Sequence, residues 1–389
     1  MSSWRHAWPG LLATLNAVGL SRFAYTPLVP FLIAAGIVTE TGAAYLGAAN
    51  LAGYLLGAAA AAPLAARIGV GRAIRLSFAT SVLALAACIW PGGFWWYVPW
   101  RFVVGVTGAV LMVLAPSFVL AEMPAGERGR SGGVIYTGVG VGIALSSLVV
   151  PSLAGTSIAW AWAALTAGAL LTALATWPCW RGGVTLSRAA VSLHGLGVPA
   201  LLVALAFGMD GIGFIPHMLF WVDYIARSLA LGTTAGALQW LMFGSGAMLG
   251  PWLGGVVGDR IGIGRALVLA FALKSAAVLL PALSTALPLL TISSLVTGAL
   301  TPGIAALSAA RMAELVEPGR QIRAWGFATL IFGLFQAAGA YGMAYAYDAR
   351  RSYGPLYAAG AGFEAVGALS AAAALLLATR AKVVIRQAP

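Results

Sequence analysis

A few charged side chains stand inside long apolar stretches of the sequence, and they are the first candidates for chemistry. Residues 8–36 form an apolar run with one charge, Arg22, and with Asn16 and Tyr25 nearby. A charge at the centre of a membrane-spanning helix costs about 2.5–3.5 kcal/mol on insertion scales, so it normally faces a partner or a water-filled cavity. A guanidinium offers fixed, paired donors to a carboxylate. We therefore expect Arg22 to bind an anionic group, with Asn16 and Tyr25 as neutral hydrogen-bonding or packing residues. A structural arginine, paired with a backbone carbonyl or an acid, is the alternative.

A second cation, Arg101, lies in the apolar run 95–121 and is followed one turn later by Gly105. A second buried cation would strengthen an anion site. The alternative is an arginine near a helix end whose long side chain reaches the membrane surface.

Titratable groups stand in a later run, 196–225. Asp210 and His217 are seven residues apart in it, which places them on one face of a helix. A buried carboxylate and a histidine can both exchange a proton, so we regard both as candidates for proton coupling as well as for substrate binding. Asp210 as a fixed counter-ion of Arg22, with no proton exchanged, is the alternative.

Two further features concern acids near the ends of spans or in outer helices. Glu364 is the one acid in the run 354–379, where we expect it to meet a partner on a neighbouring helix or to carry a proton. Asp223 and Arg227 have the spacing of an i, i+4 pair, which we expect at the outer surface.

The elements that would position these residues are membrane-spanning helices. Hydrophobic residues make up 61% of the 389-residue chain and charged residues 8%, against about 25% charged in ordinary soluble domains. An apolar run of about 20 residues crosses the hydrocarbon core as a helix. Such runs lie at 8–36, 41–66, 74–91, 95–121, 131–154, 157–178, 196–225, 232–257, 265–283, 286–311, 323–346 and 354–379.

The basic residues orient these spans. The net charge is +12, but the 22 lysines and arginines fall mostly in connections on the side of both termini. The opposite side has Arg227, Arg350 and Arg351, and the spans hold Arg22, Arg101 and Lys274. An excess of Lys and Arg marks cytoplasmic connections. We therefore expect both termini in the cytoplasm and no nucleic-acid partner.

The sequence also contains an internal repeat. Residues 66–73 (ARIGVGRA) return 193 residues later as residues 259–266 (DRIGIGRA). The same offset relates Gly53 to Gly246 and Gly105 to Gly298. We therefore expect two parallel six-helix halves, 1–180 and 196–389, joined by a cytoplasmic connection at 181–195. Such repeats are typical of secondary transporters.

The repeated loop carries a family resemblance. The major facilitator superfamily has a loop signature that is matched by Gly255, Asp259, Arg260, Gly262 and Arg265, and in degenerate form by Arg67, Gly69 and Arg72. Arg101 and Gly105 resemble its fourth-helix signature. The stretch SRFAYTPLVP, residues 21–30, resembles the bacterial YbfB/YjiJ-type branch. The resemblance implies an all-α integral membrane fold of twelve helices in the bacterial inner membrane. It also implies a central cavity lined by the first, fourth, seventh and tenth spans, and loop-motif residues that act in gating.

These observations together predict a secondary active transporter that works by alternating access. We expect proton-coupled movement of a small organic anion by a monomer. A proton-driven exporter of hydrophobic or cationic compounds is the alternative, and a copper importer using Met209, His217, Met218, Met242 and Met248 is a weaker one. The sequence has no catalytic constellation, and it predicts no enzyme, cofactor or resident metal. Cys88 and Cys179 lie in apolar runs and predict no disulfide.

Overall fold

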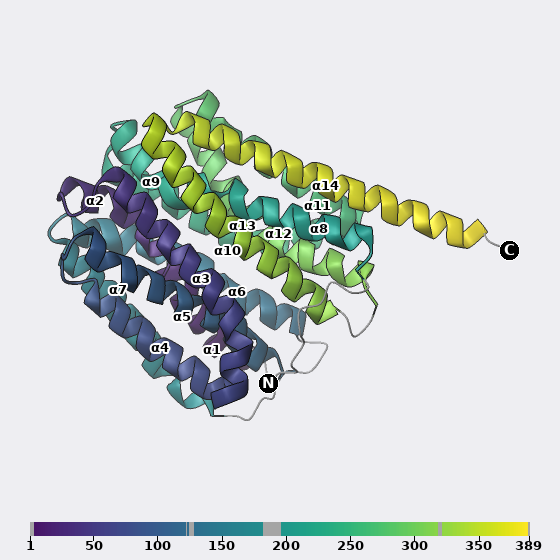
Figure 1. The fold of residues 1–389 in the computed structure, drawn as a ribbon, viewed down its shortest axis with the longest axis horizontal. Coiled ribbons are helices and arrows are strands. Elements are labelled where there is room, and N and C mark those ends of the chain that lie inside the picture. The colour runs from purple at the N-terminus through teal and green to yellow at the C-terminus, as the bar shows by residue number, and fades with distance from the viewer. Residues whose placement is uncertain (1–3, 122, 124–127, 182–195, 318–320, 388–389) are drawn as a thin grey trace.

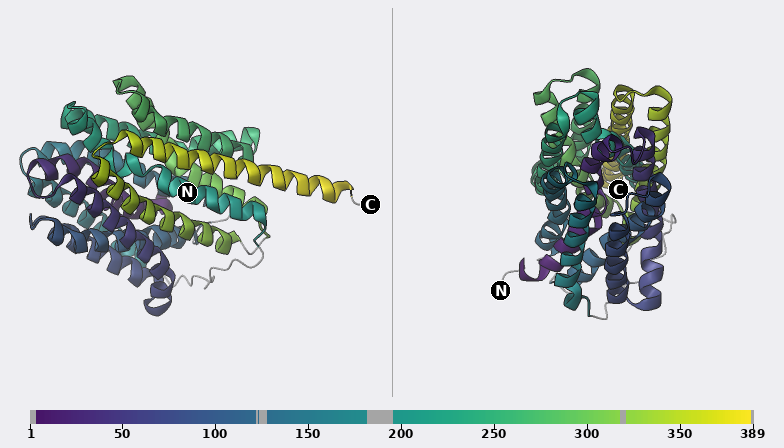
Figure 2. Two further views of the ribbon diagram at one scale, coloured as in Figure 1. Left: turned by 45° about the horizontal axis from the view of Figure 1, so that its top comes forward. Right: turned by 90° about the vertical axis from the view of Figure 1, so that its left-hand side faces the viewer.

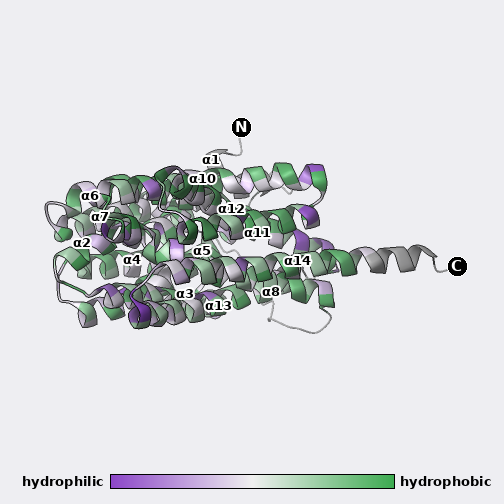
Figure 3. Cartoon of the chain, turned by 90° about the horizontal axis from the view of Figure 1, so that it is seen from above, coloured by the Kyte–Doolittle hydropathy of each residue, from purple (hydrophilic) through white to green (hydrophobic). Residues whose placement is uncertain are grey.

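The computed structural model describes the chain except residues 1–3, 122, 124–127, 182–195, 318–320 and 388–389. In the described ranges it is helical, without strands, and twelve of its helices are long and apolar enough to cross a membrane. Hydrophobic residues cover most of these helices (Figure 3). The predicted fold class is confirmed.

The first half contains the interrupted first span and five further spans. The helices are α1 (Trp4–Thr14), η1 (Leu15–Leu20), η2 (Phe23–Leu28), α2 (Val29–Ala34), α3 (Glu40–Ile68), α4 (Val70–Ala87), α5 (Phe94–Ala121), α6 (Arg128–Ala154), α7 (Ile158–Thr176) and η4 (Trp177–Trp180).

The second half repeats this order, with its own interrupted first span. The helices are α8 (Val198–Gly213), η5 (Pro216–Phe220), α9 (Trp221–Asp223), η6 (Tyr224–Ser228), α10 (Gly232–Ile261), α11 (Ile263–Leu283), α12 (Leu287–Leu315), α13 (Gln321–Arg350) and α14 (Gly354–Gln387). The predicted connection at 181–195 lies almost wholly outside the described residues.

Glycine contacts recur at the predicted offset of 193 residues. A Cβ on Gly53 would collide with the backbone oxygen of Phe102, and a Cβ on Gly246 would collide with that of Leu295. Only glycine allows the helix backbones to approach this closely. The turns repeat too, because Gly69 and the glycine 193 residues later, Gly262, have φ angles of 87° and 89°.

The halves lie side by side along the bundle (Figures 1 and 2). Helix α3 packs against α13, and α6 packs against α10. The start of α1 and the end of α14 lie toward one end of the bundle (Figure 1). We call the opposite end, which carries the connections 35–39, 229–231 and 351–353, the distal end.

Candidate functional site

The first span is broken at the stretch that contains Arg22. Pro27 and Pro30 have no N–H to donate, so the α-helical ladder cannot run through this segment. The helix passes from the π-helix η1 to the 3-10 helix η2, and the N–H of Tyr25 donates to the carbonyl of Arg22 at 3.3 Å. The carbonyl of Ser21 is thereby left for another partner.

Arg22 lies where the halves meet. Its Nη2 donates to the sulfur of Met218, in the second half, at 3.0 Å. Its Cζ lies 5.4 Å from the ring centre of Phe23 and 5.0 Å from that of Tyr54. The side chain is buried, its Nε has no hydrogen-bond partner, and no ion pair to Arg22 occurs among the described residues. Arg22 is therefore a cation held by π-electron faces and a thioether.

Arg101 supports the broken helix. Its Nη1 donates to the carbonyl of Ser21 at 3.0 Å, and its Cζ lies 4.2 Å from the ring centre of Tyr25. The hydroxyl of Tyr25 donates to the carbonyl of Ala43 at 2.8 Å. Arg101 is 1% exposed, so it does not extend to the membrane surface. In this conformation Arg101 and Tyr25 fix the geometry around Arg22.

Asn16 is also engaged within the first half. Its Nδ2 donates to the carbonyl of Ala169 at 3.1 Å and to the hydroxyl of Thr172 at 2.9 Å. Its Oδ1 accepts from Ser21 and Ser81, each at 3.4 Å. The amide therefore ties the first span to α7 and α4 in the structure.

Asp210 pairs with Lys274 rather than with Arg22. Lys274 Nζ on α11 lies 2.5 Å from Asp210 Oδ1 on α8 and 3.5 Å from Glu364 Oε1 on α14. The ring centre of Phe214 lies 4.8 Å from the same Nζ. All three charged side chains are at most 1% exposed. The structure thus brings together two of the predicted titratable residues around a lysine.

His217 lies near this group but has other partners. Its Nε2 is 2.8 Å from the hydroxyl of Ser293, which itself donates to the carbonyl of Ala277. A hydroxyl has one proton to donate, so the Nε2 of His217 is the donor in their contact. The ring stacks on Trp221 with 4.4 Å between centroids. This imidazole is therefore held in one tautomer.

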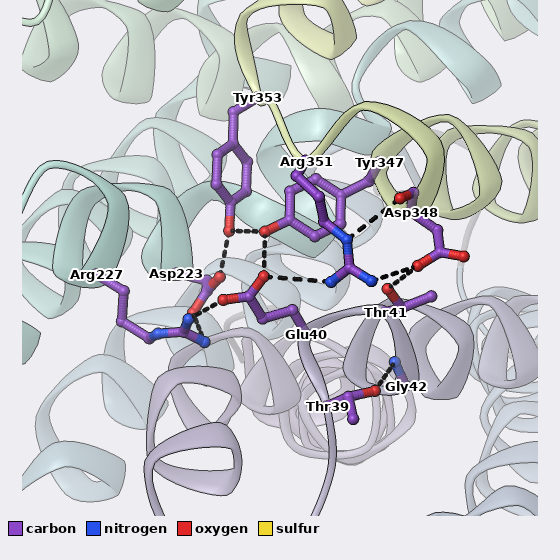
Figure 4. A network of polar contacts seen from close by, with 10 residues as sticks. All are labelled: Thr39, Glu40, Thr41, Gly42, Asp223, Arg227, Tyr347, Asp348, Arg351 and Tyr353. Carbon is purple, nitrogen blue, oxygen red and sulfur yellow. Dashed lines mark hydrogen bonds and ion pairs between the residues drawn. The ribbon is translucent and has the colours of Figure 1, made fainter.

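A polar network joins the halves at the distal end (Figure 4). Glu40, at the start of α3, accepts from Arg227 and from the hydroxyl of Tyr347 at 2.9 Å. The Tyr347 hydroxyl lies 3.1 Å from that of Tyr353, which donates to Asp223. We call these residues, together with Thr41, Asp348 and Arg351, the distal network.

The distal network corrects one expectation. Asp223 and Arg227 do form the i, i+4 pair, at 3.5 Å, but Asp223 is buried at 3% exposure and does not lie on the surface. Burial and the charge of Asp223 raise the pKa of Tyr353. Tyr353 therefore keeps its proton and remains a hydrogen-bond donor.

The match to known proteins follows this geometry. A family model described as "Uncharacterised MFS-type transporter YbfB" matches residues 14–377. The chain belongs to this family. It is a multi-pass membrane transporter of MFS type and not an enzyme.

Curated relatives match part of the chain. Proteins described as "Uncharacterized MFS-type transporter YcaD" from Salmonella arizonae and Salmonella dublin are 27% and 26% identical over 158 residues. Each match spans 40% of this chain and 41% of the relative.

Solved structures match the fold of nearly the whole chain. A D-xylose-proton symporter has a TM-score of 0.77 at 15% identity, and covers 96% of this chain and 97% of its own. The xylose transporter XylE from E. coli, in a partially occluded inward-open conformation, has a TM-score of 0.72 at 15% identity, with coverages of 93% and 95%. At this identity the likeness concerns the fold alone.

The loop motif of this MFS-type transporter lies at the end of the bundle opposite the distal network. In the second half Gly255, Asp259 and Arg260 lie in α10, Gly262 forms the turn, and Arg265 lies in the first turn of α11. In the first half Arg67 lies in the last turn of α3, and Arg72 lies in the first turn of α4. Gly69 and Gly262 allow the two tight turns, because their φ angles are positive.

Sequence reasoning missed several residues of these sites. Lys274 was visible as the one lysine within a span, and a lone buried cation indicates an acidic partner. Met218 was assigned only to a copper hypothesis. Tyr54, Tyr347 and Tyr353 carry no sequence signal that separates them from interfacial tyrosines.

Proposed function

We propose that this MFS-type transporter moves a small organic anion by alternating access, with Arg22 as the residue that contacts the anion. The observation that supports this most is that Arg22 is a buried guanidinium at the junction of the halves without a carboxylate partner among the described residues.

The energetics favour a ligand for this cation. A buried charge without an opposite charge is costly, and a thioether with two aromatic faces compensates only part of that cost. A carboxylate would accept two parallel N–H bonds from the guanidinium. Because Met218 belongs to the second half, a ligand at this position would contact both halves of the transporter.

The second half supplies candidates for proton coupling: Asp210, His217 and Glu364. We propose that a proton gradient drives transport of the anion. Asp210 and Glu364 face Lys274, so neither is a free anion for a cationic compound, and this weakens the exporter alternative.

Copper import also has less support. The sulfur of Met218 accepts a hydrogen bond from Arg22, and a copper ion at that sulfur would lie beside a guanidinium. Among the residues that the structure describes, no group of three or more His, Cys, Asp or Glu residues is placed to hold a metal ion.

We also propose that the transporter works as a monomer in the bacterial inner membrane, with both termini in the cytoplasm. The distribution of lysine and arginine supports this orientation. The repeat offset supports halves at 1–180 and 196–389. Labelling of Leu231→Cys and of Ile261→Cys, each in protein that lacks Cys88 and Cys179, tests the orientation with a membrane-impermeant reagent in intact cells. Both positions are exposed and flank opposite ends of α10, and labelling of Ile261→Cys alone would contradict the orientation.

The function is tested with purified transporter in proteoliposomes under an imposed pH gradient. Radiolabelled acetate, lactate, benzoate and succinate serve as probes. We expect accumulation of at least one anion by the wild type, loss of it in Arg22→Ala, and partial retention in Arg22→Lys, which keeps the charge but loses the paired donors. Arg350→Ala, at an exposed position, is the control. Anion flux that persists unchanged in Arg22→Ala would refute the role of Arg22.

A further inference from the structure

Three charged side chains meet inside the second half, away from Arg22. Asp210, Lys274 and Glu364 come from α8, α11 and α14, and the side chains are 0–1% exposed. We call them the buried triad. Helix α14 approaches α8 closely here, because a Cβ on Gly213 would come within 2.5–2.6 Å of atoms of the Glu364 side chain. Gly213 therefore leaves the space that Glu364 occupies.

The charges of the buried triad do not balance when both acids are ionised. One ammonium and two carboxylates leave a net charge of −1 on side chains that are at most 1% exposed. Helices α10, α12 and α13 pack around this half, and their described charged side chains lie near the helix ends: Asp259, Arg260, Arg311, Glu314, Asp348 and Arg350. They are not placed to neutralise the middle of the bundle.

The other titratable groups near the triad do not balance it either. His217 follows α8 and interacts electrostatically with Lys274, and Tyr357 on α14 lies edge-on to the His217 ring at 5.3 Å. The Nε2 of His217 donates to Ser293, and a second positive charge beside Lys274 would be unfavourable. The missing charge is therefore not supplied by the histidine.

The buried triad also lacks hydrogen-bond donors. Asp210 Oδ2 and Glu364 Oε2 are buried and have no hydrogen-bond partner among the described residues, and Glu364 Oε1 has only the Lys274 ammonium, 3.5 Å away. The two carboxyl groups nevertheless lie close enough to interact with each other. Two carboxylates are both acceptors and repel, whereas a carboxylic acid donates its O–H to a neighbouring carboxylate. One added proton would correct both the charge and the missing donor.

We propose that Asp210, Lys274 and Glu364 form a proton-binding site that holds one exchangeable proton on Glu364. Lys274 is an ammonium ion, Asp210 is its carboxylate partner, and the Glu364 hydroxyl donates to Asp210. On protonation an O–H bond forms at a Glu364 oxygen, with the proton supplied by water; on release the proton returns to water. The link between this proton and transport rests on the proposed function, but the site itself does not.

Charge neutrality gives a distinct prediction for each variant. Glu364→Gln and Asp210→Asn each leave one acid beside one ammonium, so no buried carboxylic acid remains. Lys274→Met removes the cation, so both acids become protonated. The double variant Lys274→Met/Glu364→Gln again holds one buried acid, now on Asp210.

Infrared hydrogen–deuterium difference spectroscopy on purified transporter in lipid tests these predictions without any substrate. A protonated carboxylic acid has a carbonyl stretch that is separate from the carboxylate bands and shifts in D2O. We expect one such band in the wild type, none in Glu364→Gln or Asp210→Asn, about twice the intensity in Lys274→Met, and recovery in the double variant. Asp348→Asn, at an exposed acid, is the control and leaves the band unchanged.

The wild type gives a result even where a variant fails to fold. Absence of a deuterium-sensitive acid band in folded wild-type protein, or a band that survives in Glu364→Gln, overturns the proposal. In proteoliposomes we expect Glu364→Gln to retain exchange of an anion that the wild type carries, but to lose accumulation driven by the pH gradient. A wild type that has the acid band but carries no anion refutes the proposed function alone.

Discussion

Replacement of Glu40 by glutamine should open the distal end. Glu40 is the first-half residue on which three partners from the second half converge. It accepts from Arg227 and from Tyr347 at 2.9 Å, and it lies 3.6 Å from Arg351. Glutamine keeps the size of the side chain and an acceptor for Tyr347, but removes the charge that attracts both arginines.

The size of the effect follows from burial. A hydrogen bond to a charged group contributes about 1.5–3 kcal/mol to stability, whereas an exposed ion pair contributes about 0–1 kcal/mol. The Glu40 side chain is 30% exposed, so we expect a loss near the boundary of these ranges, about 1.5 kcal/mol. Since about 1.4 kcal/mol is a factor of ten in an equilibrium constant, the population with an open distal end should rise about tenfold.

Thiol labelling measures that population. Leu219 in the second half is 6% exposed and packs against Gly47 of the first half. Leu219→Cys, in protein that lacks Cys88 and Cys179, should react with a maleimide only when the distal end opens. We expect labelling about ten times faster when Glu40→Gln is added.

A matched acid in the same network provides the control. Asp348 accepts from Thr41 and Arg351, but it is 44% exposed, so Asp348→Asn should raise the labelling rate about threefold or less. Equal rates for the two variants, or a wild-type rate in Glu40→Gln, would refute the assignment of Glu40 as the principal contact that closes this end.

Three further outcomes are expected. Gly250→Ala places a Cβ against a backbone oxygen of α12 and should destabilise the protein by about 1–3 kcal/mol. Gly255→Ala meets no neighbouring atom and replaces glycine by a better helix former, so it should not lower the thermal unfolding temperature in detergent. Because the pKa of Tyr353 is raised by burial and by Asp223, its stabilising effect should be full below about pH 10, the ordinary tyrosine value, and should decline as pH rises above that. Tyr353→Phe should remove this alkaline decline in unfolding experiments. Lys274→Met removes the cation from two buried acids, so we expect the free energy of unfolding in denaturant at pH 8 to fall by about 3–5 kcal/mol. A fall of less than about 1 kcal/mol would contradict the buried ion pair.

The fold could be predicted from the sequence because its determinants are local. Apolar runs of membrane-spanning length mark each helix, and the repeated glycines identify positions where backbones must touch. The contacts of Gly53 and Gly246 illustrate this, since each meets a backbone oxygen at an equivalent place in its half. Pro27 and Pro30 act just as locally, because a residue without an N–H interrupts the helix in which it stands.

The pairing of charges could not be predicted in the same way. Whether Asp210 faces Arg22 or Lys274 depends on the rotation of each helix about its axis, which small differences in packing decide. Each charged residue can be recognised in the sequence, but its partner cannot: Lys274, the partner of Asp210, lies 64 residues away on another helix. The sequence therefore predicted the kinds of group present in the site and left their combinations open.

The interrupted first span of the second half connects the proposed proton site to the proposed anion site. The segment formed by α8 and η5 carries Asp210 in the buried triad and, two turns later, Met218, whose sulfur and carbonyl accept from Arg22 and Thr26 of the other half. Equilibrium coupling between two sites is reciprocal: if a bound anion changes proton affinity by some factor, protonation changes anion affinity by the same factor. Titration of the proton with and without saturating anion would therefore give the coupling free energy of the transporter in the absence of any gradient.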